Sequence, residues 1–177
     1  MARPAILYIA TTLDGYIAKP NDNLDFLSIV EKEGEDYGYA DFAKTVDTVI
    51  MGRKTYDWIM KYAPDFYHID KTSFIITRTA RPSIGNTHFY TGNIKELILR
   101  LKSESGSNIF IEGGAEVIDE LLKESLIDEF VISIIPILVG DGIKLFKDGQ
   151  PEQKLKLIST KPFDTGLVQL HYKVERD

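Results

Sequence analysis

Two turns marked by glycine each follow a short apolar segment and precede a helix-like pattern. The first lies in residues 49–55, Val-Ile-Met-Gly-Arg-Lys-Thr, and the second in residues 109–115, Ile-Phe-Ile-Glu-Gly-Gly-Ala. Such turns point backbone N–H groups and a helix N-terminus outward, where they can hold a phosphate. Arg53 and Lys54 add positive charge, and Thr55 can cap the helix. Two such turns in one small chain predict a nucleotide cofactor with more than one phosphate.

A third strand end, at residues 75–79, places threonine hydroxyls on both sides of Arg78. If the three strand ends are neighbours, Arg53 and Arg78 could share the 2′-phosphate of an NADP-type cofactor. Arginine suits this role because its fork donates two parallel hydrogen bonds to phosphate oxygens. Each of these turns also has a simpler interpretation, as a capped helix or a tight connection with solvated cations.

Several other chemistries are excluded by what the sequence lacks. The first turn is not a P-loop, because Arg53 stands where that motif requires glycine before the lysine. The dinucleotide fingerprint of the Rossmann fold is absent after Gly113. The chain has no cysteine, which excludes disulfides and the cysteine-ligated zinc of nucleotide deaminases. No metal site is predicted from the three scattered histidines.

Alternating strand and helix patterns must position these turns. Apolar segments predict strands over residues 5–10, 46–51, 72–77, 87–90, 108–112, 130–139 (bent at Pro136), 154–159 and 168–174. Helical spacing predicts helices over residues 36–45, 55–62, 94–101 and 117–122. This order predicts an α/β fold with a mixed, mostly parallel sheet, helices on its faces and antiparallel C-terminal strands. We expect a single domain over residues 1–177.

Composition limits the partners and the location. The formal charge of −6 offers no basic surface, so we expect no nucleic-acid partner. No apolar segment reaches the roughly 18 residues of a membrane span, and no signal peptide is recognised, so we expect no membrane partner. Cytoplasmic is the default localisation.

The order of the motifs is similar to that of a known family. The segments 12–18 (Thr-Leu-Asp-Gly-Tyr-Ile-Ala), 46–56, 111–114 and 136–142 (Pro-Ile-Leu-Val-Gly-Asp-Gly) resemble the reductase domain at the C-terminal end of the bifunctional riboflavin-biosynthesis deaminase/reductase. The resemblance extends from about residue 6 to residue 174. It implies a dihydrofolate reductase-like, three-layer αβα fold and NADPH as the hydride donor.

The resemblance also implies which residues bind the cofactor. The adenosine 2′-phosphate and the pyrophosphate would meet Gly52, Arg53, Lys54 and Thr55. The strand end that flanks the adenosine corresponds to Thr77 and Arg78. The turn beneath the pyrophosphate and nicotinamide, whose Gly-Gly bond is cis in dihydrofolate reductases, corresponds to Gly113, Gly114, Ala115 and Glu116. The carboxamide would be held by backbone at Ala10 and Ile17.

Two carboxylates are candidates for the catalytic acid. Asp36 lies fifteen positions before Met51, the register of the folate reductase carboxylate. In an apolar cleft its pKa would rise, and it could help to protonate the substrate. An exposed acidic helix start is the alternative interpretation. Asp14 is the second candidate, although an Asp-Gly turn explains it without catalysis.

The substrate is less defined than the cofactor. The deaminase half is absent, and Lys19 is the one cation in residues 12–26, so no cluster for a ribose 5-phosphate is apparent. Three aromatic residues could stack on a flat pterin or pyrimidine ring, or could simply pack in the core: Phe26, Tyr39 and Phe42. We expect an NADPH-dependent reductase of a small nitrogen heterocycle, either the riboflavin precursor or a pterin. The alternative is an NADP(H)-binding protein without catalysis. Because family members commonly pair through their C-terminal strands, we expect a homodimer.

Overall fold

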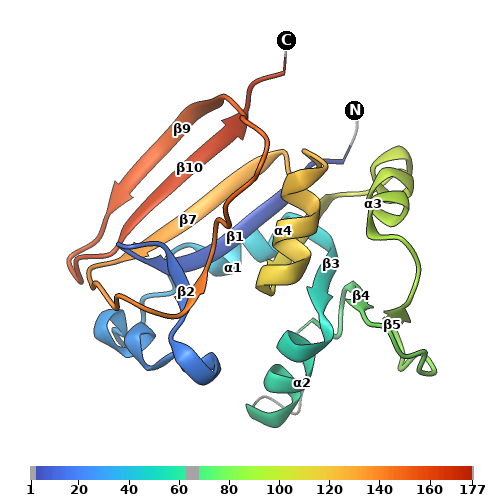
Figure 1. Cartoon of the computed structure of the whole chain (residues 1–177), viewed down its shortest axis with the longest axis horizontal. Coiled ribbons are helices and arrows are strands. Elements are labelled where there is room, and N and C mark those ends of the chain that lie inside the picture. Colours follow the sequence, from blue (N-terminus) through green and yellow to red (C-terminus); the bar gives the residue numbers. More distant parts are fainter. Residues whose placement is uncertain (1–2, 63–67, 177) are drawn as a thin grey trace.

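The computed structural model describes residues 3–62 and 68–176, and an eight-stranded sheet organises them (Figure 1). The strands are β1 (Ala5–Thr12), β2 (Tyr16–Ala18), β3 (Val46–Gly52), β4 (Thr72–Ile76), β5 (Thr87–Tyr90), β6 (Asn108–Gly113), β7 (Glu129–Ile135), β8 (Ile143–Lys144), β9 (Leu155–Pro162) and β10 (Val168–Val174). The helices are α1 (Tyr39–Lys44), α2 (Arg53–Tyr62), α3 (Ile94–Ser103) and α4 (Ala115–Lys123), with 3₁₀ helices η1 (Pro20–Asp22) and η2 (Asp25–Val30).

The strand order in the large sheet is β5-β4-β3-β6-β1-β7-β10-β9. The six strands from β5 to β7 run parallel to one another, and β10 and β9 are antiparallel to their neighbours. The short strands β2 and β8 form a separate antiparallel ribbon. The predicted mixed sheet with antiparallel C-terminal strands is therefore confirmed.

Helices cover both faces of the parallel part of the sheet. On one face, α3 and α4 pack their apolar stripes onto a cluster that contains Leu7, Ile50 and Ile111. On the other face, α1 and α2 pack onto a cluster that contains Met51 and Phe110. Residues 49–51 of β3 are apolar without alternation because strands between two helix layers are buried on both sides. The result is the expected αβα arrangement.

The parallel strands bring the sequence-predicted turns to one edge of the sheet. The carboxyl ends of β3 and β6 are adjacent, since Met51 pairs with Gly113. The end of β4 lies beside that of β3, since Gly52 pairs with Ile76. In open α/β sheets, ligands bind outside the carboxyl ends of the strands. This edge is therefore where a site is expected.

Several boundaries differ from those predicted, and two of them bear on the argument. The predicted strand over residues 130–139 ends at Ile135 and does not bend through Pro136. Proline has no N–H for the sheet, and the chain turns there as Ile137 N donates to the Ile135 carbonyl over 2.8 Å. The helix predicted from Thr55 begins at Arg53, so Thr55 lies in its first turn and is not its N-cap.

Candidate active site

The two glycine turns that the sequence singled out touch one another. A Cβ atom on Gly52 would lie 3.6 Å from the Gly114 nitrogen, and one on Gly114 would lie 3.1 Å from the Thr55 hydroxyl. The Gly113–Gly114 peptide bond is cis, as the family resemblance implies. Gly113 has φ +117°, a conformation that favours glycine. The turns after β3 and β6 thus form one continuous backbone surface.

Two helices begin at this surface. Helix α2 starts at Arg53 directly after β3, and α4 starts at Ala115 directly after Gly114. Among the described residues, no side chain caps the start of α4, so the N–H groups of its first turn are available to a ligand. Adjacent helix N-termini with free N–H groups favour an anion. The residues of this surface therefore fit a pyrophosphate.

Arginines gather beside the first turn. The Arg53 guanidinium lies 3.2 Å from one carboxylate oxygen of Asp57, and the Arg81 guanidinium lies 3.7 Å from the other. Arg81 also lies 5.5 Å over the Phe89 ring. Arg78 is exposed, two residues beyond the end of β4. Sequence reasoning missed Arg81. It lies near Arg53 because both guanidinium groups contact the carboxylate of Asp57, which is one helical turn after Arg53 in α2.

The other predicted residues at this edge take different positions. The Lys54 and Glu116 side chains are exposed, and the Thr77 hydroxyl accepts from Thr79 N over 3.2 Å. Ala10 lies in β1 beside Ser133 of β7. Ile17 packs against the larger core cluster from β2. Ala10 and Ile17 therefore lie on different elements, joined by the short turn after β1.

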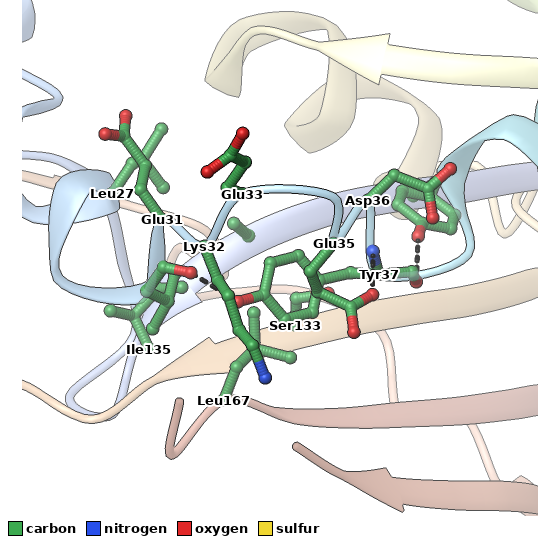
Figure 2. Close-up of a pocket in the computed structure, with 13 residues that line it drawn as sticks. Leu27, Glu31, Lys32, Glu33, Glu35, Asp36, Tyr37, Ser133, Ile135 and Leu167 are labelled. Atoms are coloured by element: carbon green, nitrogen blue, oxygen red, sulfur yellow. Dashed lines mark hydrogen bonds between the residues drawn. The ribbon is translucent and has the colours of Figure 1, made fainter. Parts of the chain in front are cut away.

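A cavity of about 560 Å³ opens beside β1 (Figure 2), within the range of small-molecule sites. Its floor comes from β1, β7 and the residue before β10, and its walls come from η2 and the following segment. The lining residues are Tyr8, Ala10, Leu27, Val30, Glu31, Lys32, Glu33, Glu35, Asp36, Tyr37, Ser133, Ile135 and Leu167. The cavity thus combines an apolar floor with a charged rim.

Two polar side chains lie among the apolar residues of the cavity floor, Tyr8 and Ser133, and both are within hydrogen-bond distance of Gln169. The Tyr8 hydroxyl donates to the Tyr37 carbonyl over 3.0 Å, and Gln169 Nε2 lies 3.0 Å from the Tyr8 oxygen. The same Gln169 nitrogen lies 3.2 Å from the Ser133 hydroxyl. Burial raises the pKa of Tyr8, so its hydroxyl stays protonated at neutral pH. Tyr8 and Ser133 can therefore offer fixed polar contacts to a flat ligand.

Neither predicted catalytic carboxylate has the expected environment. Asp36 is exposed and accepts hydrogen bonds from Ala40 N and Gly38 N, each over 2.9 Å, which lower its pKa. The predicted rise in its pKa is therefore wrong: Asp36 lies at the cavity rim and binds the backbone at the start of α1. Asp14 accepts from the Thr12 hydroxyl, which lowers its pKa, and from Val139 N and Gly140 N. Its carboxylate joins the turn after β1 to the segment after β7.

The three predicted stacking rings pack in the core and do not line the cavity. Phe26 is 2% exposed, in a cluster with Ile135 and Leu167. Phe42 stacks on Tyr8 at 4.5 Å between ring centroids, and Tyr39 meets Tyr8 edge-on at 5.7 Å. The simpler interpretation holds for these rings, and Tyr8 and Tyr37 supply the aromatic lining instead.

Sequence reasoning missed a buried carboxyl group directly before the second glycine turn. Glu112 is 12% exposed, and its Oε2 lies 3.0 Å from Nε2 of the buried His68. Burial raises the pKa of Glu112 to about 8 and lowers the pKa of His68 to about 4. At pH 7 the Glu112 carboxyl group is therefore largely protonated and the His68 imidazole is neutral. Glu112 directly follows Ile111, which pairs with Leu7, the residue before Tyr8 of the cavity lining.

The sheet order and the paired glycine turns define a dihydrofolate reductase-like α/β protein. The model of the RibD C-terminal domain family matches residues 4–169, and the chain belongs to this family. Among related sequences, the YwjB protein of Bacillus subtilis (strain 168) is 46% identical over 174 residues, covering 97% of this chain and 98% of YwjB.

Solved structures share the fold over nearly the whole chain. A candidate riboflavin biosynthesis protein of Shewanella sp. PV-4 superimposes with a TM-score of 0.87 at 31% identity, covering 99% of this chain and 100% of that one. The dihydrofolate reductase of Enterococcus faecalis, solved with NADP(H), superimposes with a TM-score of 0.65 at 15% identity over 99% of this chain and 100% of its own. The second likeness supports the fold alone.

The described residues contain neither a membrane-spanning helix nor a cluster of metal-ligating side chains. No helix in residues 3–62 and 68–176 is both long and apolar enough to cross a membrane. The same residues contain no group of three or more His, Cys, Asp or Glu side chains that could hold a metal ion.

Proposed function

We propose that this protein is an NADPH-dependent reductase of a small nitrogen heterocycle. The observation that carries the proposal is the contact between the two glycine turns. A cavity of suitable size is lined in part by Tyr8 and Ala10 of β1, the strand beside β6. Neither turn alone distinguishes a phosphate site from a tight connection. Together they offer two helix N-termini, an uncapped first turn and a cluster of arginines at the ligand-binding edge of the sheet.

The residues at this edge fit NADPH. A side chain at Gly52 or Gly114 would narrow the space where the two turns meet, so glycine keeps the backbone accessible. Arg53, Arg78 and Arg81 would hold the 2′-phosphate, and the first turn of α4 would meet the pyrophosphate. When bound, NADPH would supply the hydride for reduction. The positions proposed to hold it are Ala10, Ile17, Gly52, Arg53, Lys54, Thr55, Thr77, Arg78, Gly113, Gly114, Ala115 and Glu116.

We propose Glu112, and not Asp36 or Asp14, as the proton donor. Reducing a C=N bond adds a hydride to carbon and a proton to nitrogen. A carboxyl group that is still protonated at pH 7 can give that proton, whereas groups with a lowered pKa have already lost theirs. Glu112 is next to Gly113 in the chain, and the residue before it, Ile111, pairs with Leu7, which precedes the cavity residue Tyr8. His68 can hold the Glu112 carboxyl group in place.

Substrate screening tests the proposed reaction. The purified protein should oxidise NADPH in the presence of an aminopyrimidine such as 5-amino-6-(ribosylamino)uracil or a pterin such as 7,8-dihydropterin. Loss of NADPH absorbance and product mass measure the reaction. Tight NADPH binding with no oxidation across both panels would instead favour the second candidate, an NADP(H)-binding protein without catalysis, which the lack of a raised pKa at Asp36 keeps open.

Replacing Arg53 should weaken the binding of NADPH much more than the binding of NADH. Asp57 holds its guanidinium beside the turn after β3. There it would make a charge-assisted hydrogen bond to the 2′-phosphate. Arg53→Ala should weaken NADPH binding by about 10- to 100-fold, equivalent to roughly 1–3 kcal/mol, and leave NADH binding nearly unchanged. Calorimetric titration of both cofactors measures this. Arg100→Ala is the control, because Arg100 of α3 makes a similar ion pair with Glu104, the residue after that helix. Equal losses for NADPH and NADH would contradict the assignment.

We also propose a homodimer in the cytoplasm. Every residue of β9 is exposed at the edge of the sheet, including Leu155, Leu157 and Ile158. A hollow of about 450 Å³ lies nearby, lined in part by Phe130, Leu170 and Tyr172. Burying such apolar surface favours association. Light scattering should give twice the chain mass of 20.0 kDa.

A further inference from the structure

We propose that the acidic rim of the cavity makes this reductase select an uncharged or cationic heterocycle and reject a phosphorylated one. The inference rests on the proposed function, because it concerns the substrate of the same site. Its basis is the charge distribution around the cavity and not the chemistry of reduction. The inference distinguishes two possible substrates between which the family resemblance does not choose: a heterocycle that carries a ribose phosphate and one that does not.

Carboxylates dominate the charged lining of the cavity. Among its described lining residues, Glu31, Glu33, Glu35 and Asp36 are acidic and Lys32 is basic, a formal net charge of −3. All four carboxylates lie within residues 31–36, which connect η2 to α1. Among the described residues, the carboxylates of Glu31 and Glu33 have no ion-pair or hydrogen-bond partner, so their charge is uncompensated at the rim.

The single lysine does not neutralise this rim. Figure 2 shows the Glu31 and Glu33 side chains pointing to one side of the segment and Lys32 extending to the opposite side, toward Leu167. The Lys32 ammonium lies 3.6 Å from the exposed carboxylate of Asp164. Its charge is therefore directed to the neighbouring loop and away from the two free glutamates.

The floor gives no compensating cation. It consists of Ala10, Ile135 and Leu167 with the hydroxyl groups of Tyr8 and Ser133. Hydroxyl groups can hold ring nitrogens and carbonyl oxygens, but a phosphate with nearly two negative charges needs cations or several N–H donors. Like charges at a binding site oppose each other, so the rim should repel such a group. Carboxylates also accept hydrogen bonds from exocyclic amino groups, which suits an aminopyrimidine or a pterin.

A matched pair of ligands tests the inference. The probes are 5-amino-6-(ribosylamino)uracil and its 5′-phosphate, which share the ring and sugar and differ in the phosphate. Dissociation constants are measured by calorimetry with the full-length protein saturated with NADP⁺, and kcat/KM is measured with NADPH. We expect the unphosphorylated ligand to bind at least about 10-fold more tightly, with the difference shrinking as salt screens the rim.

Rim variants identify the cause of the preference. Glu31→Lys combined with Glu33→Lys should reduce or reverse the preference by on the order of 10-fold or more, because repulsion is replaced by attraction. Glu120→Gln combined with Glu152→Gln removes two exposed charges outside the cavity lining and should leave it unchanged.

The outcomes separate this inference from the proposed function. If NADPH does not bind, the proposed function fails. If NADPH binds and the 5′-phosphate binds equally or more tightly, the inference is overturned while the cofactor site stands. Binding of neither ligand to the NADP⁺ complex, or a preference that survives the rim reversal, also overturns it.

Discussion

Glu112→Gln is expected to lower kcat by about 10²- to 10⁴-fold, the usual contribution of a general acid. The amide keeps the shape and polarity of the side chain but has no acidic proton. NADPH affinity should change little, since the cofactor would contact the backbone of the following glycines. Stopped-flow or steady-state oxidation of NADPH with a turned-over substrate measures kcat. Glu120→Gln, an exposed change on α4, is the matched control.

The dependence of kcat on pH should show that the proton donor is active in its protonated form. Because burial raises the pKa of Glu112 to about 8, kcat should be level below that pH and fall above it. Glu112→Gln should lose this alkaline limb. A variant that keeps both wild-type kcat and the limb near pH 8 would show that the proton comes from elsewhere.

Stability should follow the same titration. The folded-state pKa of Glu112 lies above the unfolded value of about 4.3, so the native state binds the extra proton between these values. The resulting stabilisation is complete below about pH 4 and is lost as pH rises through about 8, by roughly 1 kcal/mol between pH 7 and pH 8. His68, with its pKa lowered to about 4, acts in the opposite sense but only below pH 6.5. Urea unfolding at pH 7 and pH 8, which needs no substrate, should show this loss in the wild type and not in Glu112→Gln.

Gly113→Ala should damage both the fold and the cofactor site. Gly113 holds φ +117°, where a residue with a Cβ is strained, at a cost of about 1–3 kcal/mol. We expect urea unfolding to show a loss of this size and calorimetry to show NADPH binding weakened by at least about 10-fold, because the turn would relax away from its shape.

The matched control for this change is Gly85→Ala. Gly85 also has a positive φ, +55°, but no atom lies within 4 Å of the added Cβ. It lies in the segment before β5 and belongs neither to the turn before α2 nor to the turn before α4. It should lose some stability and keep full NADPH affinity. Unchanged NADPH affinity in Gly113→Ala would place the cofactor away from this turn.

Local patterns in the sequence were sufficient for most of the fold. Apolar segments that end at Gly52 and Gly113 predicted parallel strands with functional ends, because buried strands and glycine turns leave strong local signals. The stripe of α3 was equally clear, and Asn93 caps that helix by accepting from Lys95 N and Glu96 N. Pro136 indicated an irregularity in the predicted strand, but the sequence did not show whether the strand bends there or ends before it. That choice depends on the turn made by Ile137 and on the partner segment.

The catalytic part of the site could not be predicted in the same way, because it depends on contacts between distant residues. Glu112 was visible in the sequence as the residue before Gly113, but its raised pKa depends on burial and on its position beside His68, 44 positions away. Asp36 was placed by register, yet its pKa is set by N–H groups of the following turn. Tyr8 lines the cavity because β1 lies beside β7, which no local pattern reveals.

The central claim is that the turns after β3 and β6 form one NADPH site. Calorimetric titration of the wild-type protein with NADPH and NADH tests it most directly. We expect saturable binding of one NADPH per chain, at least about 10-fold tighter than NADH, because only NADPH carries the 2′-phosphate that the arginines would bind. Absence of saturable NADPH binding, or equal affinity for the two cofactors, would contradict it.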